Sequence, residues 1–365
     1  MQVSCGRGIT SVGDVAMENF MSLQGVIRHI LREHVELAAF QWSQQRMLSR
    51  AHPMDNAAID HVNARLSANL DAVLIGGEAA WPIILDRFED FPEEGELFVA
   101  AHLAMALGDA ERIDQCLWLA HQTPDARTGL ADALAQFPPT VSGPTVRRML
   151  RADSAVIRAA ALDVLAHHRA DAGALLITCL SDPSPILRAS AIALAAATGR
   201  SDCAAQIADL AEEAAPDLRF AASAALAELG HPTALTLLKA EVEDGAHAED
   251  ALRLLRQVLP EADFLSYLGM LYGRAETRAL AVRGIGMTGD RDRLGWLIEQ
   301  MASPAMAIAA GESFLELFPE AAGASGLFTY DGASLGAEFE GESGAFPVAS
   351  EVSIWAKGGG TRNPH

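Results

Sequence analysis

Small and apolar residues recur through the middle of the chain in one frame, which begins with an arginine. A small residue follows at position +3 and apolar residues follow at +6, +7 and +10, a spacing that places them on one face of a helix. The frame begins at Arg127, Arg158, Arg188, Arg219 and Arg278. These arginines are 31, 30, 31 and 59 residues apart, and the last interval is two periods. This self-similarity predicts a helical repeat protein, because no single unit of this size can bury its apolar face alone.

The period also locates units that lack the arginine. Ala248 and Ala307 stand at the arginine positions of two further copies, and a weaker copy over residues 98–107 begins the array. We therefore expect about eight units over residues 93–320, each with two short helices joined by turns. Three units carry a glycine at +11, where a residue in the left-handed conformation commonly ends a helix; they are Gly199, Gly230 and Gly289.

The chain before the array has a different pattern. Residues 1–20 lack a sustained apolar stretch, and we expect a disordered tail there. Residues 21–92 carry apolar positions at helical spacing, which predicts an N-terminal helical cap. Within the cap we expect one long helix over residues 21–47 and a second over residues 55–74.

The chain after the array changes in composition. Gly, Ser and Glu dominate from Ala321 to Gly344, which favours an acidic segment of low order. We predict that residues 321–365 form a Gly/Glu-rich tail of low order, in which residues 348–355 are the one candidate for a short strand or docking segment.

The frame Arg-x-x-Ala-x-x-(Ala/Leu)-Leu resembles that of HEAT-like repeats, and the resemblance covers about two-thirds of the chain. It implies an all-α fold: a HEAT-like α-α superhelix, wound as a right-handed solenoid, with the N-terminal helical block as its cap. Aromatic residues make up only 6% of the chain, which also disfavours a large β-sheet.

Three stretches carry a narrower resemblance: residues 30–42 (ILREHVELAAFQW), 65–72 (RLSANLDA) and 95–98 (GELF). They resemble a proteobacterial HEAT-repeat family that is often encoded beside type VI secretion effector and spike genes. The resemblance implies a role in that neighbourhood and no particular activity. Members of that family usually carry a Pro-Asp and tandem-Trp element followed by further helical repeat, whereas this chain has Pro-Val-Ala-Ser at 347–350 and one later tryptophan, Trp355.

Charge and composition exclude several classes of partner. The chain has 48 acidic and 27 basic residues, a formal net charge of −21, and only two of the basic residues are lysines. Such a chain repels phosphate backbones, so we expect no nucleic-acid partner. The four cysteines are widely spaced, which indicates reduced thiols in a cytoplasmic protein. No run of about 18 apolar residues is free of charge, so we expect no membrane-spanning helix.

The arginines that begin the frame could bind phosphate or could serve the fold. Repeated arginines near a turn commonly bond the carboxylates or carbonyls of an adjacent unit, and their planar guanidinium groups suit that role. Asp153, Asp182, Asp217 and Glu276 are close enough in sequence to accept such bonds. We therefore interpret the arginines as a structural Arg ladder of Arg127, Arg158, Arg188, Arg219 and Arg278.

Two rows of positions are expected on the inner, concave face of the repeats. In the five arginine-led units, position +5 reads Asp, Asp, Ala, Ala and Arg, and position +9 reads Gln, His, Ala, Glu and Met. Small residues allow a partner's backbone to approach, and carboxylates select against acidic ligands. The candidate partner-binding residues are Asp132, Gln136, Asp163, His167, Ala193, Ala224, Glu228 and Arg283.

No motif indicates catalysis, a metal or a cofactor. The chain has no Gly-x-Ser-x-Gly elbow, no P-loop, and no His-Glu dipeptide of the kind that holds iron in some HEAT-like hydroxylases. The adjacent residues His167 and His168 would point about 100° apart on a helix, which disfavours a shared metal. We interpret His34 as a core or interface histidine.

The predicted function is therefore a non-enzymatic, protein-binding scaffold or adaptor in the cytoplasm, with no nucleic-acid or membrane partner. By resemblance, its partner would be a secretion effector, a spike component or a chaperone. Two alternatives stay open: an immunity protein that sequesters a cationic toxin, and a HEAT-like enzyme similar to bilin lyases or alkylpurine DNA glycosylases.

Overall fold

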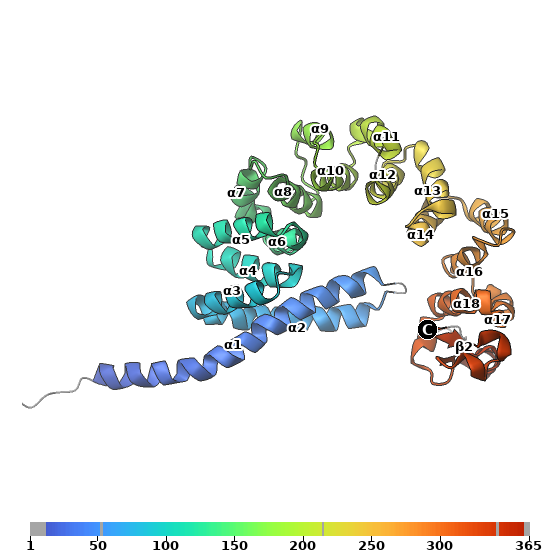
Figure 1. The fold of residues 1–365 in the computed structure, drawn as a ribbon, viewed down its shortest axis with the longest axis horizontal. Helices are drawn as coiled ribbons and strands as arrows, with labels where there is room; N and C mark the ends of the chain where they lie inside the picture. Colours follow the sequence, from blue (N-terminus) through green and yellow to red (C-terminus); the bar gives the residue numbers. More distant parts are fainter. Residues whose placement is uncertain (1–11, 52–53, 214, 341–342, 361–365) are drawn as a thin grey trace, which may run out of the picture. The chain divides into compact units, whose positions relative to one another are not determined.

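The computed structural model describes residues 12–51, 54–213, 215–340 and 343–360, and almost all of its secondary structure is helical. The helices pack in pairs, consistent with a HEAT-like helical repeat array, and the predicted all-α fold class is confirmed (Figure 1). The chain divides into two units, Met1–Leu194 and Ala195–His365, which we describe separately.

The first unit contains an N-terminal helical block followed by helix pairs. Within the pairs, α5 packs on α4 and α6, and α7 packs on α8, while α4, α6 and α8 also pack on one another in succession. The helices are α1 (Val12–Arg50), α2 (Asn56–Gly76), α3 (Ala80–Asp90), α4 (Glu94–Leu107), α5 (Ala110–Gln122), α6 (Arg127–Ala135), α7 (Pro139–Met149), α8 (Ala155–His167) and α9 (Leu175–Leu180). The helix α10 (Pro185–Ala197) begins in this unit, and the 3-10 turns η1 (Gly77–Ala79) and η2 (Pro124–Ala126) precede α3 and α6.

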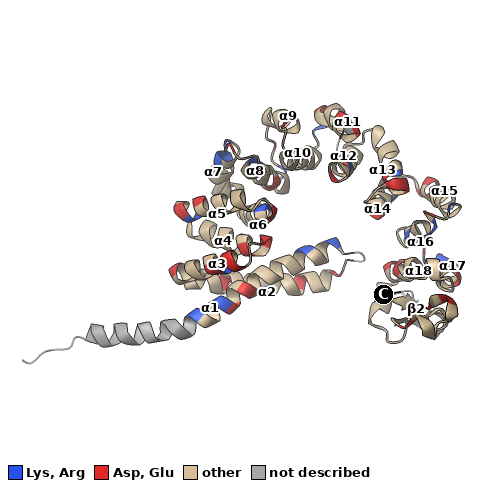
Figure 2. Cartoon of the chain, in the orientation of Figure 1, with Lys and Arg blue, Asp and Glu red and all other residues tan. Residues whose placement is uncertain are grey.

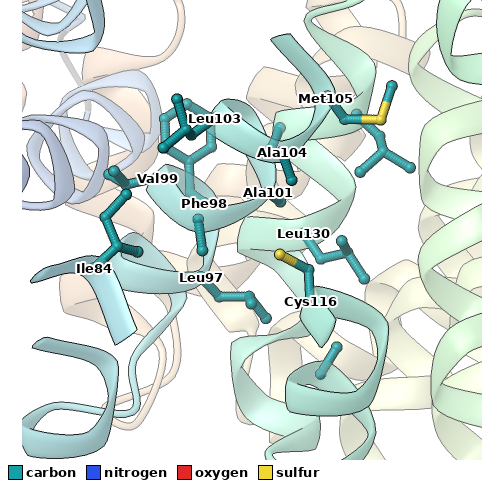
Figure 3. Packing of buried hydrophobic residues seen from close by; sticks show 14 of the residues in the cluster. Ile84, Leu97, Phe98, Val99, Ala101, Leu103, Ala104, Met105, Cys116 and Leu130 are labelled. Carbon is teal, nitrogen blue, oxygen red and sulfur yellow. The ribbon is translucent and has the colours of Figure 1, made fainter. Parts of the chain in front are cut away.

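Helix α4 lies at the centre of the first unit's core. Ten of its 14 residues are buried, because the helix packs against α1, α2 and α3 as well as α5 and α6. A helix that is apolar on all sides must be surrounded in this way. In Figure 3 its residues Phe98 and Leu103 lie among side chains that include Ile84, Cys116 and Leu130.

The N-terminal cap forms with longer helices than the sequence predicts. Helix α1 extends the expected 21–47 helix at both ends, so residues 12–20, predicted to be disordered, belong to it; no proline interrupts this stretch. Residues 1–11 lie outside the described residues. Helix α2 matches the second expected helix closely, and Gly77, with a φ of 50°, ends it.

One stretch among the described residues, Asn56–Asp90, is long and apolar enough to cross a membrane by length and composition alone. The few charges of this segment are spaced widely enough to leave an apolar window, and the expectation that the chain has no membrane-spanning helix stays a prediction. The structure breaks the stretch at η1, and Leu66, Leu70 and Val73 of α2 are buried against the rest of the cap.

The second unit continues as helix pairs, in which α11 packs on α12, α13 on α14, α15 on α16 and α17 on α18. Helices α16 and α18 also pack directly on each other. The helices are α11 (Ala204–Glu213), α12 (Pro216–Glu228), α13 (Thr233–Asp244), α14 (Ala248–Val258), α15 (Glu261–Tyr272), α16 (Arg278–Gly286), α17 (Leu294–Met301), α18 (Pro304–Leu317) and α19 (Ala349–Trp355). The 3-10 turns η3 (Ser201–Cys203) and η4 (Arg291–Arg293) lead into α11 and α17.

The predicted glycine helix ends are confirmed. Gly199, Gly230 and Gly289 have φ values of 66°, 68° and 73°, in the left-handed region that disfavours residues with a Cβ. Each glycine follows a helix that carries the arginine-led frame, so the repeat period in the sequence corresponds to a repeated local structure.

The segment after α18 is more structured than its composition predicts. It forms the turns η5 (Pro319–Gly323), η6 (Gly332–Ser334) and η7 (Ala337–Phe339), the strands β1 (Phe328–Thr329) and β2 (Phe346–Pro347), then α19 and the turn η8 (Ala356–Gly360). The two strands pair antiparallel, with Phe328 opposite Pro347. Residues 348–355, expected to be a strand or docking segment, are mostly helical.

Aromatic packing explains why this Gly-rich segment folds. Trp355 lies edge-on to Phe314 and Phe318, with ring centroids 5.4 and 5.8 Å away, and Phe346 and Val352 are buried. These apolar residues are too far apart in the sequence to produce a periodic pattern, so composition alone indicates low order. The segment packs on α17 and α18 and covers part of the apolar surface at the end of the array.

Candidate functional site

Arginines of the predicted ladder contact neighbouring carboxylates and carbonyls. Arg158 donates from Nη2 to Asp182 Oδ2 at 2.9 Å, and its Nη1 donates to the Asp153 carbonyl at 2.9 Å. Arg278 donates from Nε to the Tyr272 carbonyl at 3.0 Å. These bonds connect both arginines to neighbouring residues of the fold, as the structural interpretation predicts.

Two other ladder positions have different surroundings. The carboxylate of Asp217, an expected acceptor, lies 2.9 Å from His247 Nε2, and Arg219 instead lies 3.6 Å from the carboxylate of Glu241. Arg188 is half-buried, and its Nε forms no hydrogen bond with the described residues. The ladder is therefore not uniform along the chain.

Two repeats of the first unit, Met1–Leu194, have an aspartate at position +5 of the frame, and both aspartates are ion-paired. Arg46 of α1 donates from Nη1 to Asp132 Oδ2 of α6 at 2.6 Å. Arg127 of α6 donates from Nη1 to Asp163 Oδ2 of α8 at 3.1 Å. The two acidic residues predicted at position +5 are thus neutralised by arginines from α1 and α6, which come earlier in the chain.

Burial acts on both carboxyl groups. Burial raises the pKa of Asp132 above its ordinary value, while the nearby positive charge of Arg46 partly opposes the shift. Burial likewise raises the pKa of Asp163; the positive charge of Arg127 opposes the shift, and the negative charge of Asp132 adds to it. Both groups therefore retain a proton more readily than an exposed aspartate does.

Three predicted face residues meet in one pocket of the first unit. Asp132, Gln136 and His167 line a cavity of ≈ 330 Å³ whose other walls come from α1 and α2. A second hollow of ≈ 440 Å³ adjoins it and shares Trp42, Arg46 and Arg50. Figure 2 shows basic residues on the last turns of α1, which form this wall. The remaining residues of the pocket are Gln45, Ser49, Asn63, Leu66 and Ala135.

Three other predicted face residues lie elsewhere. Ala193 and Glu228 are exposed and Ala224 is half-buried. None of the three lines the pocket beside Arg46 or the groove beside Arg283 that is described below. Positions +5 and +9 of the repeat frame are therefore accessible at these three residues, but the three residues do not line either hollow.

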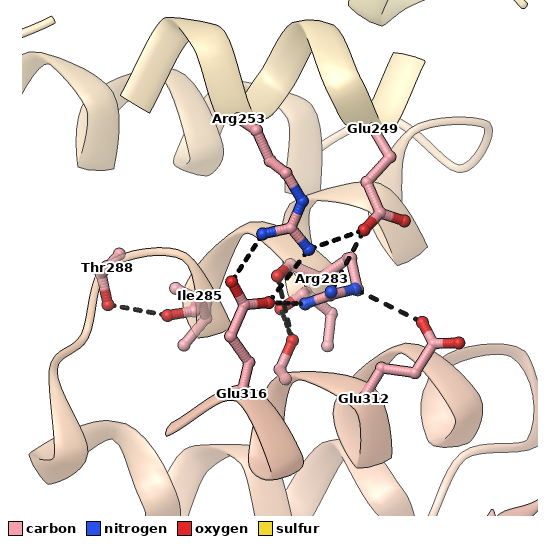
Figure 4. Close-up of polar contacts among 9 residues, drawn as sticks. Glu249, Arg253, Arg283, Ile285, Thr288, Glu312 and Glu316 are labelled. Carbon is pink, nitrogen blue, oxygen red and sulfur yellow. Dashed lines mark hydrogen bonds and ion pairs between the residues drawn. The ribbon is translucent and has the colours of Figure 1, made fainter. Parts of the chain in front are cut away.

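The eighth predicted residue, Arg283, is buried and lies in a charged cluster of the second unit. Its side chain, 6% exposed, pairs with Glu316, lies 3.1 Å from Glu249 and lies 3.4 Å from Glu312 (Figure 4). Arg253 completes the cluster and binds the same Glu316 carboxylate. Carboxylates enclose most of the Arg283 side chain, because Glu316 of α18 reaches it from the next helix pair, but Arg283 still lines the groove described next.

A groove of ≈ 550 Å³ lies beside this cluster, along α16 and α18. Small and apolar side chains form most of its lining, and Glu249, Arg283 and Glu312 supply the charged part. Burial raises the pKa of Glu312, and the positive charge of Arg283 opposes the shift. The apolar lining consists of Ala279, Leu280, Pro304, Ala305, Ile308 and Ala309.

Sequence reasoning missed the residues that complete these two sites. Arg253 stands at position +5 of the unit that begins at Ala248, and Glu312 and Glu316 stand at +5 and +9 of the unit that begins at Ala307. Extending the two rows to the units without arginine would have found all three. Arg46 lies in α1, outside the repeats, and no spacing rule points to it.

Histidines in the described residues take part in local packing. His34 Nδ1 lies 2.7 Å from Asn69 Oδ1, and the Asn69 amide donates to Gln41 Oε1 at 2.8 Å. Because the Asn69 oxygen can only accept, His34 must donate from Nδ1. The rings of His167 and His168 are edge-on to each other. Within the part of the chain that the structure describes, no three His, Cys, Asp or Glu side chains are placed to hold a metal ion.

Comparison with known proteins agrees with this architecture. Residues 173–259 match the family described as HEAT repeats. No curated protein and no solved structure matches the chain. The matched residues span α9 to α14, and similar helix pairs lie before and after them. HEAT repeats generally mediate protein–protein binding, so the chain has the features of a protein-binding scaffold.

Proposed function

We propose that this protein is a non-enzymatic scaffold that binds a polypeptide segment in the groove along α16 and α18. The groove is the observation that carries the proposal: it is open, most of its lining is small and apolar, and its charged lining residues are Glu249, Glu312 and Arg283. A side chain of moderate size can pack on Ile308, which is 37% exposed, while the alanines let the partner's backbone approach closely.

The charges of the cluster define the partner. Glu249, Glu312 and Glu316 carry three negative charges against the two positive charges of Arg253 and Arg283, so the local balance is −1. Glu312 has the most accessible carboxylate, with 55% of its side chain exposed. The partner segment therefore combines a Lys or Arg side chain, which pairs with Glu312, with a neighbouring apolar residue that packs on Ile308.

The resemblance of residues 30–42, 65–72 and 95–98 to the proteobacterial HEAT-repeat family supports a particular cellular role. We propose an adaptor role in the cytoplasm, in which the bound segment belongs to a type VI effector, a spike component or a companion chaperone. No catalytic step is part of this proposal. The overall charge of −21 supports a basic partner, because it favours encounter with cationic surfaces.

An immunity protein that sequesters a cationic toxin is the second candidate, and the same charge favours it. Co-expression separates the two roles. If the partner's gene is toxic alone and harmless together with this protein, the immunity role is supported; if the partner is harmless alone and loses delivery without this protein, the adaptor role is supported.

The binding proposal is tested by co-purification with variants of the groove. Full-length tagged protein, Glu312→Gln and Ile308→Asp would be used to isolate partners from the native host at low and moderate salt. We expect a specific partner with wild-type protein, weaker recovery at moderate salt, and loss of most of it with either variant, because one removes a charge and the other places a charge on apolar surface.

Glu276→Gln is the matched control, because Glu276 is exposed and does not line the groove. It removes the same charge as Glu312→Gln and should leave recovery unchanged. Equal recovery with all four proteins would show that the groove is not the binding site.

A further inference from the structure

The pocket at the end of α1 has the opposite charge balance to the groove. Among the residues that line it, Arg46, Arg50 and Asp132 carry fixed charges, which gives the lining a balance of +1; Glu94 lines the adjoining hollow beside both arginines. His167 and Gln136 stand on the same wall as Asp132, and both can donate hydrogen bonds. This local excess of positive charge is unexpected in a chain with a net charge of −21.

Arg46 is held in place before any ligand arrives. Its Nη1 donates to Asp132 at 2.6 Å, and its guanidinium carbon lies 5.0 Å from the centre of the Trp42 ring. Both contacts restrict the long side chain, so binding a further anion costs little conformational entropy. No described residue accepts a hydrogen bond from its Nε or Nη2, so these donors remain for a ligand.

Arg50 supplies the charge that Asp132 does not neutralise. It follows Arg46 by four residues, which places both side chains on one face of α1, and it lines both the pocket and the adjoining hollow. It is exposed and forms no ion pair with the described residues. An anion in the pocket can therefore pair with Arg50 without displacing an existing partner.

We propose that this pocket binds a carboxylate of a partner polypeptide, either an Asp or Glu side chain or the C-terminal carboxylate. The planar guanidinium of arginine matches a carboxylate with two hydrogen bonds. A single negative charge balances the local excess of +1, whereas a phosphate dianion would overcompensate it and would be repelled by Asp132. This site is separate from the groove on which the proposed function rests, so the two can be tested apart.

The central claim is that the lining of the pocket has a net positive charge. Two variants change this charge in opposite directions. Arg50→Gln removes the unpaired positive charge, so it should weaken binding of a carboxylate about fivefold, as for one partly exposed ion pair. Asp132→Asn removes the like charge and should strengthen binding. If the pocket instead receives a basic group, Asp132→Asn weakens binding and Arg50→Gln strengthens it or leaves it unchanged.

Binding would be measured by isothermal titration calorimetry on the full chain with alanine pentapeptides, all but one of which are amidated at the C-terminus. One peptide carries a central Glu, its partner carries Gln, and an all-alanine peptide is used with a free or an amidated C-terminus. Inorganic phosphate is a fifth probe. Arg151→Gln is the control variant, because Arg151 is exposed and does not line the pocket. Circular dichroism and thermal melting of each variant would establish that it is folded.

Three results together support the proposal: the Glu peptide or the peptide with a free C-terminus binds, the matched neutral peptide binds more weakly, and the two variants have opposite effects. The peptide that binds identifies the source of the carboxylate. Equal binding of the neutral peptides, no effect of Arg50→Gln, or no binding of either carboxylate would overturn it. Tighter binding of phosphate than of both carboxylate peptides would overturn the assignment to a carboxylate.

Discussion

Glu316 of α18 binds Arg253 of α14 through both oxygens: Oε1 accepts from Nη1 at 2.6 Å and Oε2 accepts from Nη2 at 3.2 Å. The two residues are 63 positions apart, and α16 lies between their helices in the sequence. Because Glu316 also pairs with Arg283 of α16, a single carboxylate connects three helices of the second unit. Burial raises the pKa of Glu316, but the two arginines outweigh it, so the net shift is downward.

Replacing Glu316 should therefore destabilise the second unit. In Glu316→Gln, the buried guanidinium of Arg283 loses its main partner, and breaking a buried charge pair costs about 3 kcal/mol in the free energy of unfolding. Urea denaturation followed by circular dichroism measures this change. Glu312→Gln is the comparison, because its carboxylate is mostly exposed and should cost less than about 1 kcal/mol. Similar losses in both variants would mean that Glu316 has no special role.

Close packing of α4 on α6 leads to a second prediction. A Cβ added at Gly129 would lie 2.8 Å from the Glu94 carbonyl carbon and 2.9 Å from the Phe98 nitrogen, so the two helices would have to separate. We expect Gly129→Ala to lower the free energy of unfolding by at least about 2 kcal/mol.

The same substitution in another helix serves as its control. Gly269 lies in the middle of α15, is exposed, and has no atom within 4 Å of an added Cβ. Gly269→Ala should therefore stabilise the protein by up to about 1 kcal/mol, through helix propensity alone. Opposite signs for the two variants in thermal unfolding would support the packing argument, and a neutral Gly129→Ala would contradict it.

Local features of the repeats could be predicted from the sequence because they depend on residues close together. Arg278 and Gly289 mark the start and the end of one frame, and the same spacing produces the same helix and the same left-handed glycine in other units. The alternation of short helices follows for the same reason, since each helix must bury one apolar face against its neighbours.

The net charges of the pocket and of the groove could not be predicted from the local spacing of residues. Asp132 reads as an acidic face residue, but Arg46, 86 positions earlier and outside the repeats, neutralises it. Arg283 reads as a lone cation on the inner face, whereas three glutamates from two other helices enclose it. Long side chains from helices far apart in the chain decide these contacts, and helical phase contains no information about them.

Cysteine reactivity gives a further prediction. Cys116 of α5 is almost completely buried, and burial raises the pKa of its thiol. Since the thiolate is the reactive form, Cys116 should resist alkylation by iodoacetamide at neutral pH in the folded protein and react once urea unfolds it. Peptide mass spectrometry after timed labelling locates the modified residue. Rapid labelling of Cys116 in the absence of urea would show that α5 opens readily.

The aspartate pair of the first unit gives a pH-dependent prediction. Because burial raises the pKa of Asp163 above its unfolded value, the folded state binds more protons between those two pKa values. The contribution of Asp163 to stability is therefore present at pH values below its unfolded pKa of about 4 and is lost as the pH rises through the folded pKa.

Asp163→Asn removes this titration, although it also leaves Arg127 without its carboxylate partner. The loss of that partner changes stability most where Asp163 is charged, so the two effects have opposite slopes. If burial dominates, as the raised pKa indicates, wild-type stability minus variant stability falls as the pH rises from about 4 and becomes constant once Asp163 is ionised. Urea denaturation at a series of pH values measures this difference. A difference that instead rises with pH would mean that the pairing with Arg127 outweighs burial and that the folded pKa of Asp163 lies below its ordinary value.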